Sequence, residues 1–174
     1  LAVGDRAEAE VLGGGQYRLT RILPRTSALR RPSRRGSGDA LLAANADFVL
    51  AVCAAPSLLR AFALPEWALE AARAAGLPAG LFVSHWDRLA PEEGDALARR
   101  LEPLRAELDS LAWGSALEPP AGLLPALRGK SVAVLGGPGC GKTALIQRLA
   151  GVQAPLRPTT AVSLSQGPDG TLWL

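Results

Sequence analysis

A glycine-rich motif at positions 136–143 constrains this chain more than any other feature of its sequence. The motif fits the pattern G-x-x-x-x-G-K-[ST], follows a predicted strand at 131–135 and precedes a predicted helix at 143–150. Glycines let consecutive backbone N–H groups wrap a phosphate, and the helix adds its positive end. The sequence therefore predicts a phosphate-binding loop, or P-loop, made of Gly136, Gly137, Pro138, Gly139, Cys140, Gly141, Lys142 and Thr143.

Two side chains of this loop have predicted chemical roles. Lys142 is expected to reach the β and γ phosphates of a nucleotide, and Thr143 to place its hydroxyl on Mg²⁺. The alternative is a glycine-rich turn with an incidental lysine. The position of the motif between a strand and a helix favours the P-loop.

Strands and helices alternate through the rest of the chain. Apolar, strand-like runs occupy 47–53, 81–83, 111–113 and 131–135, and helical patterns occupy 57–75, 91–109 and 143–150. This alternation predicts an α/β fold with a mostly parallel sheet and helices on both faces. Ligands of such folds bind at the carboxyl ends of the strands, where the P-loop begins.

The first part of the chain follows a different pattern. Two alternating segments, 5–12 and 16–23, are separated by three glycines, which predicts a β-hairpin. Two strands alone are marginally stable, so this hairpin either docks on the rest or is part of a barrel. Residues 30–38 are expected to form a linker or exposed loop. We therefore expect one unit at 1–37 and a second at 38–174.

Composition excludes several classes of protein. Hydrophobic residues make up 48% and charged residues 20% of the chain, as in globular proteins. No apolar run is long enough for a membrane span, and the first residues do not resemble a signal peptide, so we expect a cytoplasmic protein. Cys53 and Cys140 form no Cys-x-x-Cys pair, so the sequence indicates neither a disulfide framework nor a zinc site.

Positive charge gathers near the start of the chain. No acidic residue lies between Glu10 and Asp39. Such a segment either faces a nucleic acid or reflects a genome that favours arginine codons. The arginines in it are Arg18, Arg21, Arg25, Arg30, Arg31, Arg34 and Arg35.

Two further motifs lie ahead of the P-loop. The segment after the strand 81–83 corresponds to the Asn-Lys-x-Asp motif of G domains, whose aspartate pairs with the guanine N1 and N2 hydrogens. A Ser-Ala pair after the strand 111–113 corresponds to the second base-contacting motif of those domains. In the usual G domain both motifs follow the P-loop, whereas here both precede it. Their residues are Ser84, His85, Trp86, Asp87, Ser115 and Ala116.

This reversed order resembles the circularly permuted GTPases, in particular the ribosome small-subunit-dependent GTPase A family (RsgA, also called YjeQ). The resemblance implies a P-loop NTPase fold, namely a circularly permuted G domain preceded by a partial OB-fold β segment. It also implies GTP or GDP, Mg²⁺, and GTP hydrolysis that assists late maturation of the small (30S) ribosomal subunit. Partners would be that subunit and its rRNA, with no membrane partner. We expect a monomer, and zinc only in a C-terminal domain that this chain does not include.

The resemblance also assigns roles to residues. It places the nucleotide on 136–143, 84–87 and 115–116, and the catalytic roles on Lys142, Thr159 and Thr160. Magnesium would be held by Thr143 and Thr160. Chain segments that carry the match include residues 1–6, 22–25 and 43–47, which are similar to the end of the OB barrel and the start of the GTPase domain.

The chain departs from the family pattern in three places. Ser84 and His85 replace Asn-Lys, which removes an amide that braces the base site and an aliphatic stem that covers guanine. Pro158 stands where the family has a histidine implicated in hydrolysis. The chain also stops before the Asp-x-x-Gly of switch II, and we interpret Asp169-Gly170 as a hairpin turn. Alternative functions are a non-catalytic pseudo-GTPase whose arginines bind RNA, and an unrelated P-loop ATPase or kinase.

Overall fold

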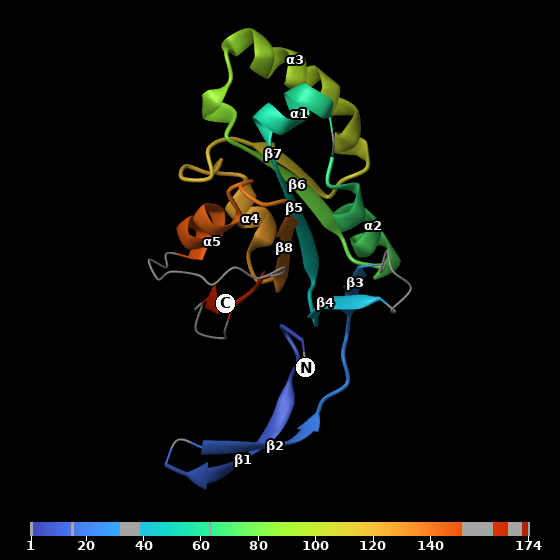
Figure 1. Cartoon of the computed structure of the whole chain (residues 1–174), viewed down its shortest axis with the longest axis vertical. Helices are drawn as coiled ribbons and strands as arrows, with labels where there is room; N and C mark the ends of the chain where they lie inside the picture. The colour runs from blue at the N-terminus through green and yellow to red at the C-terminus, as the bar shows by residue number, and fades with distance from the viewer. Residues whose placement is uncertain are drawn as a thin grey trace.

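A mixed β-sheet forms the centre of the molecule. The computed structural model describes residues 2–14, 16–31, 39–62, 64–150, 162–166 and 172–173 (Figure 1). In these residues the largest sheet has six strands in the order β10-β9-β8-β5-β6-β7. The strands are β5 (Phe48–Ala54), β6 (Ala79–Ser84), β7 (Ser110–Trp113), β8 (Val132–Gly136), β9 (Val162–Gln166) and β10 (Leu172–Trp173).

Four adjacent strands of this sheet, β8, β5, β6 and β7, run parallel. β5 pairs in parallel with both β6 and β8, and β6 pairs in parallel with β7. β9 is antiparallel to β8, and β10 is antiparallel to β9. Because parallel strands end at the same edge, β6, β7 and β8 deliver the residues that follow them to one side of the molecule. The predicted parallel α/β sheet is confirmed.

Helices cover both faces of the sheet (Figure 1). Along β5, Val49, Ala51 and Cys53 are buried in one apolar cluster, whereas Phe48 and Val52 are buried in another. Alternate residues of a strand point to opposite faces, so β5 is buried on both. The first cluster lies under α1 (Ala55–Ala61), α2 (Glu66–Ala74) and α3 (Pro91–Leu101), and the second under α4 (Leu123–Leu127) and α5 (Lys142–Ala150).

Two of the expected helices are shorter than predicted. The helix expected at 57–75 is divided into α1 and α2, because Phe62 takes a left-handed backbone (φ 45°) and Pro65 precedes α2. The helix expected at 91–109 ends at Leu101 and continues as a 3-10 turn, η2 (Glu102–Ala106), at whose second position Pro103 lacks an amide hydrogen. Helix α4 was not expected.

Two hairpins precede the sheet. β1 (Ala7–Gly13) pairs antiparallel with β2 (Gln16–Ile22), which confirms the first predicted hairpin. β3 (Ala28–Arg31) pairs antiparallel with β4 (Ala40–Ala44). The expected linker therefore begins inside a strand, and the rest of it, at 32–38, lies outside the described residues. The predicted boundary at 37 and the partial OB-fold assignment stay predictions.

Asn45 joins the first hairpin to the second. Its side-chain amide donates to the Gly4 carbonyl at 2.8 Å, and its side-chain oxygen accepts from the Thr26 backbone N–H at 2.8 Å. Asn45 is 5% exposed and has a φ of 54°, a left-handed conformation that asparagine tolerates better than most residues. Nearby, Arg25 donates two hydrogen bonds to Asp5 and holds the pKa of that carboxyl well below its usual range.

Within the described part of the chain, no helix combines the length and the apolar character that crossing a membrane requires.

Candidate nucleotide-binding site

The predicted P-loop connects β8 to α5. β8 ends at Gly136 and α5 begins at Lys142, whose neighbour Thr143 is exposed on the first turn. The Leu145 N–H donates to the Gly141 carbonyl at 2.9 Å, which closes the first helical turn. The strand–loop–helix arrangement predicted for the motif is therefore present.

Glycine is required at three positions of this loop for two different reasons. A Cβ on Gly136 would lie 2.2 Å from the carbonyl oxygen of Val52 on β5, so a side chain there forces the two strands apart. Gly139 and Gly141 have φ values of 70° and 83°, which strain any other residue. By contrast, a Cβ on Gly137 would meet nothing within 4 Å.

Lys142 lies across the loop that precedes it. Its Nζ donates to the carbonyl oxygens of Gly136 at 3.0 Å and Gly137 at 2.7 Å. The Cys140 Sγ lies 3.7 Å from the same ammonium group. The Lys142 ammonium group is therefore held against the first residues of the loop that is expected to surround a phosphate.

The end of β6 is fastened to the P-loop by Ser84. This side chain is fully buried, and its Oγ lies 2.7 Å from the Cys140 carbonyl and 3.2 Å from the Cys53 carbonyl. The His85 Nδ1 lies 2.8 Å from the same oxygen. A hydroxyl has one proton to donate, and the shorter distance favours Cys140 as its acceptor. The Ser84 hydroxyl thus ties the end of β6 to the P-loop.

The Ser-Ala motif reaches the same point of the loop. A Cβ on Gly141 would lie 3.3 Å from the Ala116 Cβ, 3.4 Å from the His85 Cε1 and 3.6 Å from the Ser84 Cβ. Ala116 is buried beside Cys140 in the apolar cluster under α5. Two segments that precede the P-loop in the sequence therefore pack directly against it, although neither is adjacent to it along the chain.

Asp87 lies on a short 3-10 turn, η1 (Trp86–Arg88), just beyond Ser84 and His85. Asp87 is exposed, whereas Trp86 is half-buried. His85 has a φ of 56°, which turns the chain sharply from β6 into η1. The turn is fixed to β7 because the Trp86 N–H donates to the Gly114 carbonyl at 3.4 Å and the Gly114 N–H donates to the Val83 carbonyl at 3.0 Å.

Both cysteines are buried near this junction. Burial raises the pKa of the Cys53 thiol to about 12, with a smaller contribution from Cys140 nearby. The Cys53 thiol therefore stays protonated at neutral pH and contributes as an apolar group. Cys140 packs under the P-loop with Leu145 and Ile146, so its side chain anchors the loop to the core.

Several expected site residues lie outside the described part of the chain. These include Thr159 and Thr160, expected to contact magnesium and the γ phosphate, and Pro158 beside them. The turn expected at Asp169-Gly170 also lies outside it, although the flanking strands β9 and β10 do pair antiparallel.

The arginines near the start of the chain are partly neutralised. Arg18 lies 3.6 Å from Glu10, and Arg21 and Arg25 form ion pairs with Glu8 and Asp5. The Arg31 guanidinium stacks 4.9 Å from the centre of the Trp67 ring. Since Arg34 and Arg35 lie outside the described residues, Arg30 is the remaining exposed arginine of the seven for which no such contact is seen there. Three of the seven arginines thus have an acidic partner within the described residues.

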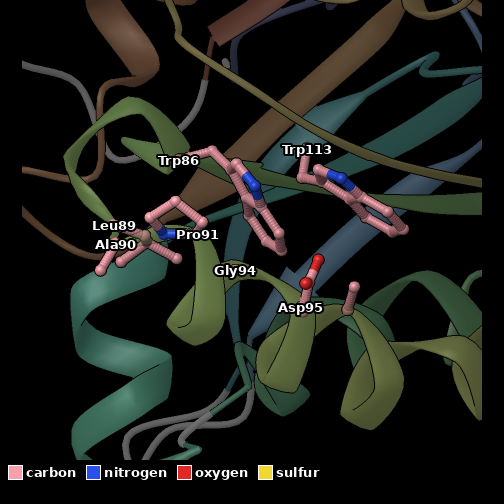
Figure 2. Close-up of a pocket in the computed structure, with 8 residues that line it drawn as sticks. Trp86, Leu89, Ala90, Pro91, Gly94, Asp95 and Trp113 are labelled. Atoms are coloured by element: carbon pink, nitrogen blue, oxygen red, sulfur yellow. The ribbon is translucent and has the colours of Figure 1, made fainter.

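A pocket beside the base motif was not predicted. It is formed by Trp86 and Trp113 together with the start of α3 (Figure 2). The sequence places Trp86 among the expected nucleotide-binding residues of the base motif. The available signal was the position of Trp113 at the carboxyl end of a parallel strand, directly before Gly114.

Comparisons with known proteins agree with this geometry. A sequence profile described as RsgA GTPase matches residues 22–170. The fold is similar to the crystal structure of YjeQ from Thermotoga maritima, with a TM-score of 0.64 and 22% identity over 99% of this chain and 59% of that one. It is also similar to YloQ, described as a circularly permuted GTPase, with a TM-score of 0.57 and 20% identity over 98% of this chain and 54% of that one. No curated protein matches by sequence. The chain thus spans somewhat more than half the length of each structure.

Proposed function

Because the chain belongs to the RsgA GTPase family, we propose that it binds GTP and GDP in the circularly permuted site described above and hydrolyses GTP. The packing of the base motifs against the P-loop is the main support for this proposal. Ser84 and Ala116, which belong to the two base motifs, pack against Cys140 and Gly141 of the P-loop. A single nucleotide can therefore contact the phosphate loop and the base-binding segments together.

The chemistry of each part fits a guanine nucleotide. The backbone N–H groups of the P-loop, the Lys142 ammonium and the start of α5 would bind the phosphates. The Asp87 carboxylate accepts hydrogen bonds, and guanine offers N1–H and N2–H donors on one edge. Adenine presents an unprotonated N1 on the corresponding edge, which a carboxylate repels. Asp87 would therefore select guanine.

Magnesium would be held at the first turn of α5. The exposed Thr143 hydroxyl next to Lys142 fits one position of a magnesium ion that otherwise binds phosphate oxygens and water. When bound, the ion would neutralise charge on the phosphates. By family membership we further propose a cytoplasmic role in late maturation of the small ribosomal subunit, with that subunit and its rRNA as partners.

Competition titrations with a fluorescent GDP analogue test the choice of base. GDP and GTP should compete at concentrations at least about tenfold lower than ADP and ATP, because losing a hydrogen bond to a charged group costs about 1.5–3 kcal/mol. Asp87→Asn should weaken GDP binding and strengthen binding of xanthosine diphosphate, whose 2-carbonyl accepts from the new amide. Glu107→Gln, an exposed acid elsewhere, serves as the control. Equal affinity for ADP, or no effect of Asp87→Asn, would mean that this site does not select guanine through Asp87.

The replacement of the family histidine by Pro158 favours a second candidate function, a non-catalytic pseudo-GTPase. Proline can neither orient a water molecule nor donate a proton. Phosphate release under multiple-turnover conditions, with and without small ribosomal subunits, separates the two. We expect subunit-stimulated release of many phosphates per chain, and binding without turnover would identify the pseudo-GTPase.

A further inference from the structure

A second pocket lies behind the base motif and is separate from the P-loop. Its volume is about 390 Å³, and its lining includes Trp86, Trp113, Pro91 and Asp95 (Figure 2). Trp86 comes from η1, Trp113 from the end of β7, and the other two from the first turns of α3. No P-loop residue contributes to this lining.

Two stacked tryptophans form the aromatic wall of the pocket. The Trp86 and Trp113 rings are stacked, with centroids 5.2 Å apart and planes 22° from parallel. The indole Nε1 of Trp86 lies so close to Gly94 that a Cβ there would be 3.3 Å from it. The Arg105 guanidinium lies 5.7 Å from the Trp113 centroid. The indole pair already attracts one cation from within the chain.

The pocket also contains an unneutralised carboxylate. Asp95 is exposed on α3, and Figure 2 shows its carboxylate pointing toward the two indole rings. The hydrogen bonds and ion pairs of the described residues involve other carboxylates, those of Asp5, Glu8, Glu10, Asp47, Glu93, Glu102 and Asp109. Within the described residues no hydrogen bond or ion pair to Asp95 is seen, so its carboxylate is open to a cation from outside.

These features select one kind of ligand. The faces of indole rings carry negative potential, so the wall and Asp95 both favour a positive charge. An anion is repelled, and a neutral aromatic group leaves the carboxylate unpaired. A guanidinium is flat and weakly hydrated, so it can stack on an indole while donating two hydrogen bonds to a carboxylate. A compact ammonium is more strongly hydrated and cannot stack in this way.

We propose that this pocket binds an arginine side chain presented by a partner polypeptide. Asp95 is the charged residue of its lining, so nothing there would bind the α-ammonium and α-carboxylate groups of free arginine. The opening therefore suits a side chain whose backbone stays outside. The proposal does not depend on phosphate binding by the P-loop, because the pocket and the P-loop share no residue, although Trp86 also belongs to the base motif.

NMR titration of the ¹⁵N-labelled chain tests the proposal. The chain has four tryptophans, and Trp86→Phe and Trp113→Phe assign two of the indole N–H signals. N-acetylarginine methylamide should shift these two signals. The uncharged isostere N-acetylcitrulline methylamide should need at least about tenfold more ligand, equivalent to about 1.4 kcal/mol.

Three variants make the test specific. Asp95→Asn should weaken arginine binding at least about tenfold, whereas Glu92→Gln, at an exposed acid on the same helical turn outside the pocket lining, should leave it unchanged. Ala98→Leu should block binding by filling the pocket while the Asp95 charge remains. Equal binding of citrulline, equal effects of Asp95→Asn and Glu92→Gln, or shifts spread over all indole signals would each overturn the proposal.

Discussion

Ser84 is the residue that most directly connects the two halves of the nucleotide site. Its buried hydroxyl bonds the Cys140 carbonyl of the P-loop, so Ser84→Ala leaves that carbonyl without this donor. We expect the free energy of unfolding to fall by about 1–2 kcal/mol and GDP affinity to fall several-fold. Urea denaturation and GDP titration measure both effects. Ser57→Ala, at an exposed position of α1, is the matched control and should change neither.

Gly136 and Gly137 are neighbours in the P-loop but differ in the space around their Cα atoms. An alanine at position 136 places its Cβ 2.2 Å from the Val52 carbonyl, whereas one at 137 meets nothing within 4 Å. We expect Gly136→Ala to destabilise the protein by about 1–3 kcal/mol through forced strand separation. Gly137→Ala should leave the melting temperature within about 2 °C of wild type. Equal melting temperatures of the two variants would contradict the packing seen between β8 and β5.

Among individual residues, the sequence predicted those of the P-loop but not the hydrogen bond by which Ser84 holds that loop. The Gly-Lys-Thr spacing identifies the loop because each residue has a role that only a few side chains can fill. The substitution of serine for asparagine suggested a lost contact, since a shorter side chain usually cannot span the same gap. In the fold, β6 brings the Ser84 Oγ within 2.7 Å of the Cys140 carbonyl oxygen, a distance that local sequence does not reveal.

Among the structural elements, the junction between the hairpins depends on Asn45. Its side chain bonds Gly4 and Thr26, and its backbone adopts a φ of 54°. Asn45→Gly keeps the left-handed backbone at no steric cost but loses the hydrogen bonds, whereas Asn45→Ala loses both. We expect both variants to be less stable than wild type in urea denaturation, and Asn45→Ala to be less stable than Asn45→Gly by about 1 kcal/mol. The opposite order would exclude backbone strain at this position.

Element boundaries were predicted less well than the elements themselves. Alanine and leucine spacing is continuous across 57–75, so a single helix was expected there. Phe62 terminates α1 with a left-handed turn, and its ring packs 4.0 Å from the Arg100 guanidinium of α3. This tertiary contact lies where α1 ends, and the spacing of residues along the sequence does not reveal it. The pairing of β3 with β4 was also missed. Arginine-rich segments are typical of exposed loops, so the strand was not expected there.

In the molecule as a whole, a single sheet brings together motifs that the sequence keeps apart. β6, β7 and β8 end at the same edge of the sheet because all three run parallel to β5, which lies between β8 and β6. The order of the motifs along the chain therefore matters less than the order of strands in the sheet. The fold class could therefore be predicted from the alternation of strands and helices. The tryptophan pocket between η1, β7 and α3 could not, because the pocket depends on how separate elements pack.

The last prediction follows from this arrangement and rests on the proposed nucleotide site. A bound GDP would contact both the P-loop and the turn after β6, so opening either segment would require releasing the ligand. At one hundred times its dissociation constant, GDP would stabilise the bound form by about 2.7 kcal/mol. Hydrogen exchange should therefore slow, by up to about a hundredfold, at the amides of residues 84–87 as well as 136–145. β1 and β2, which lie away from the sheet in Figure 1, should show little change and serve as the internal control. Protection confined to 136–145 would mean that the nucleotide contacts only the phosphate loop.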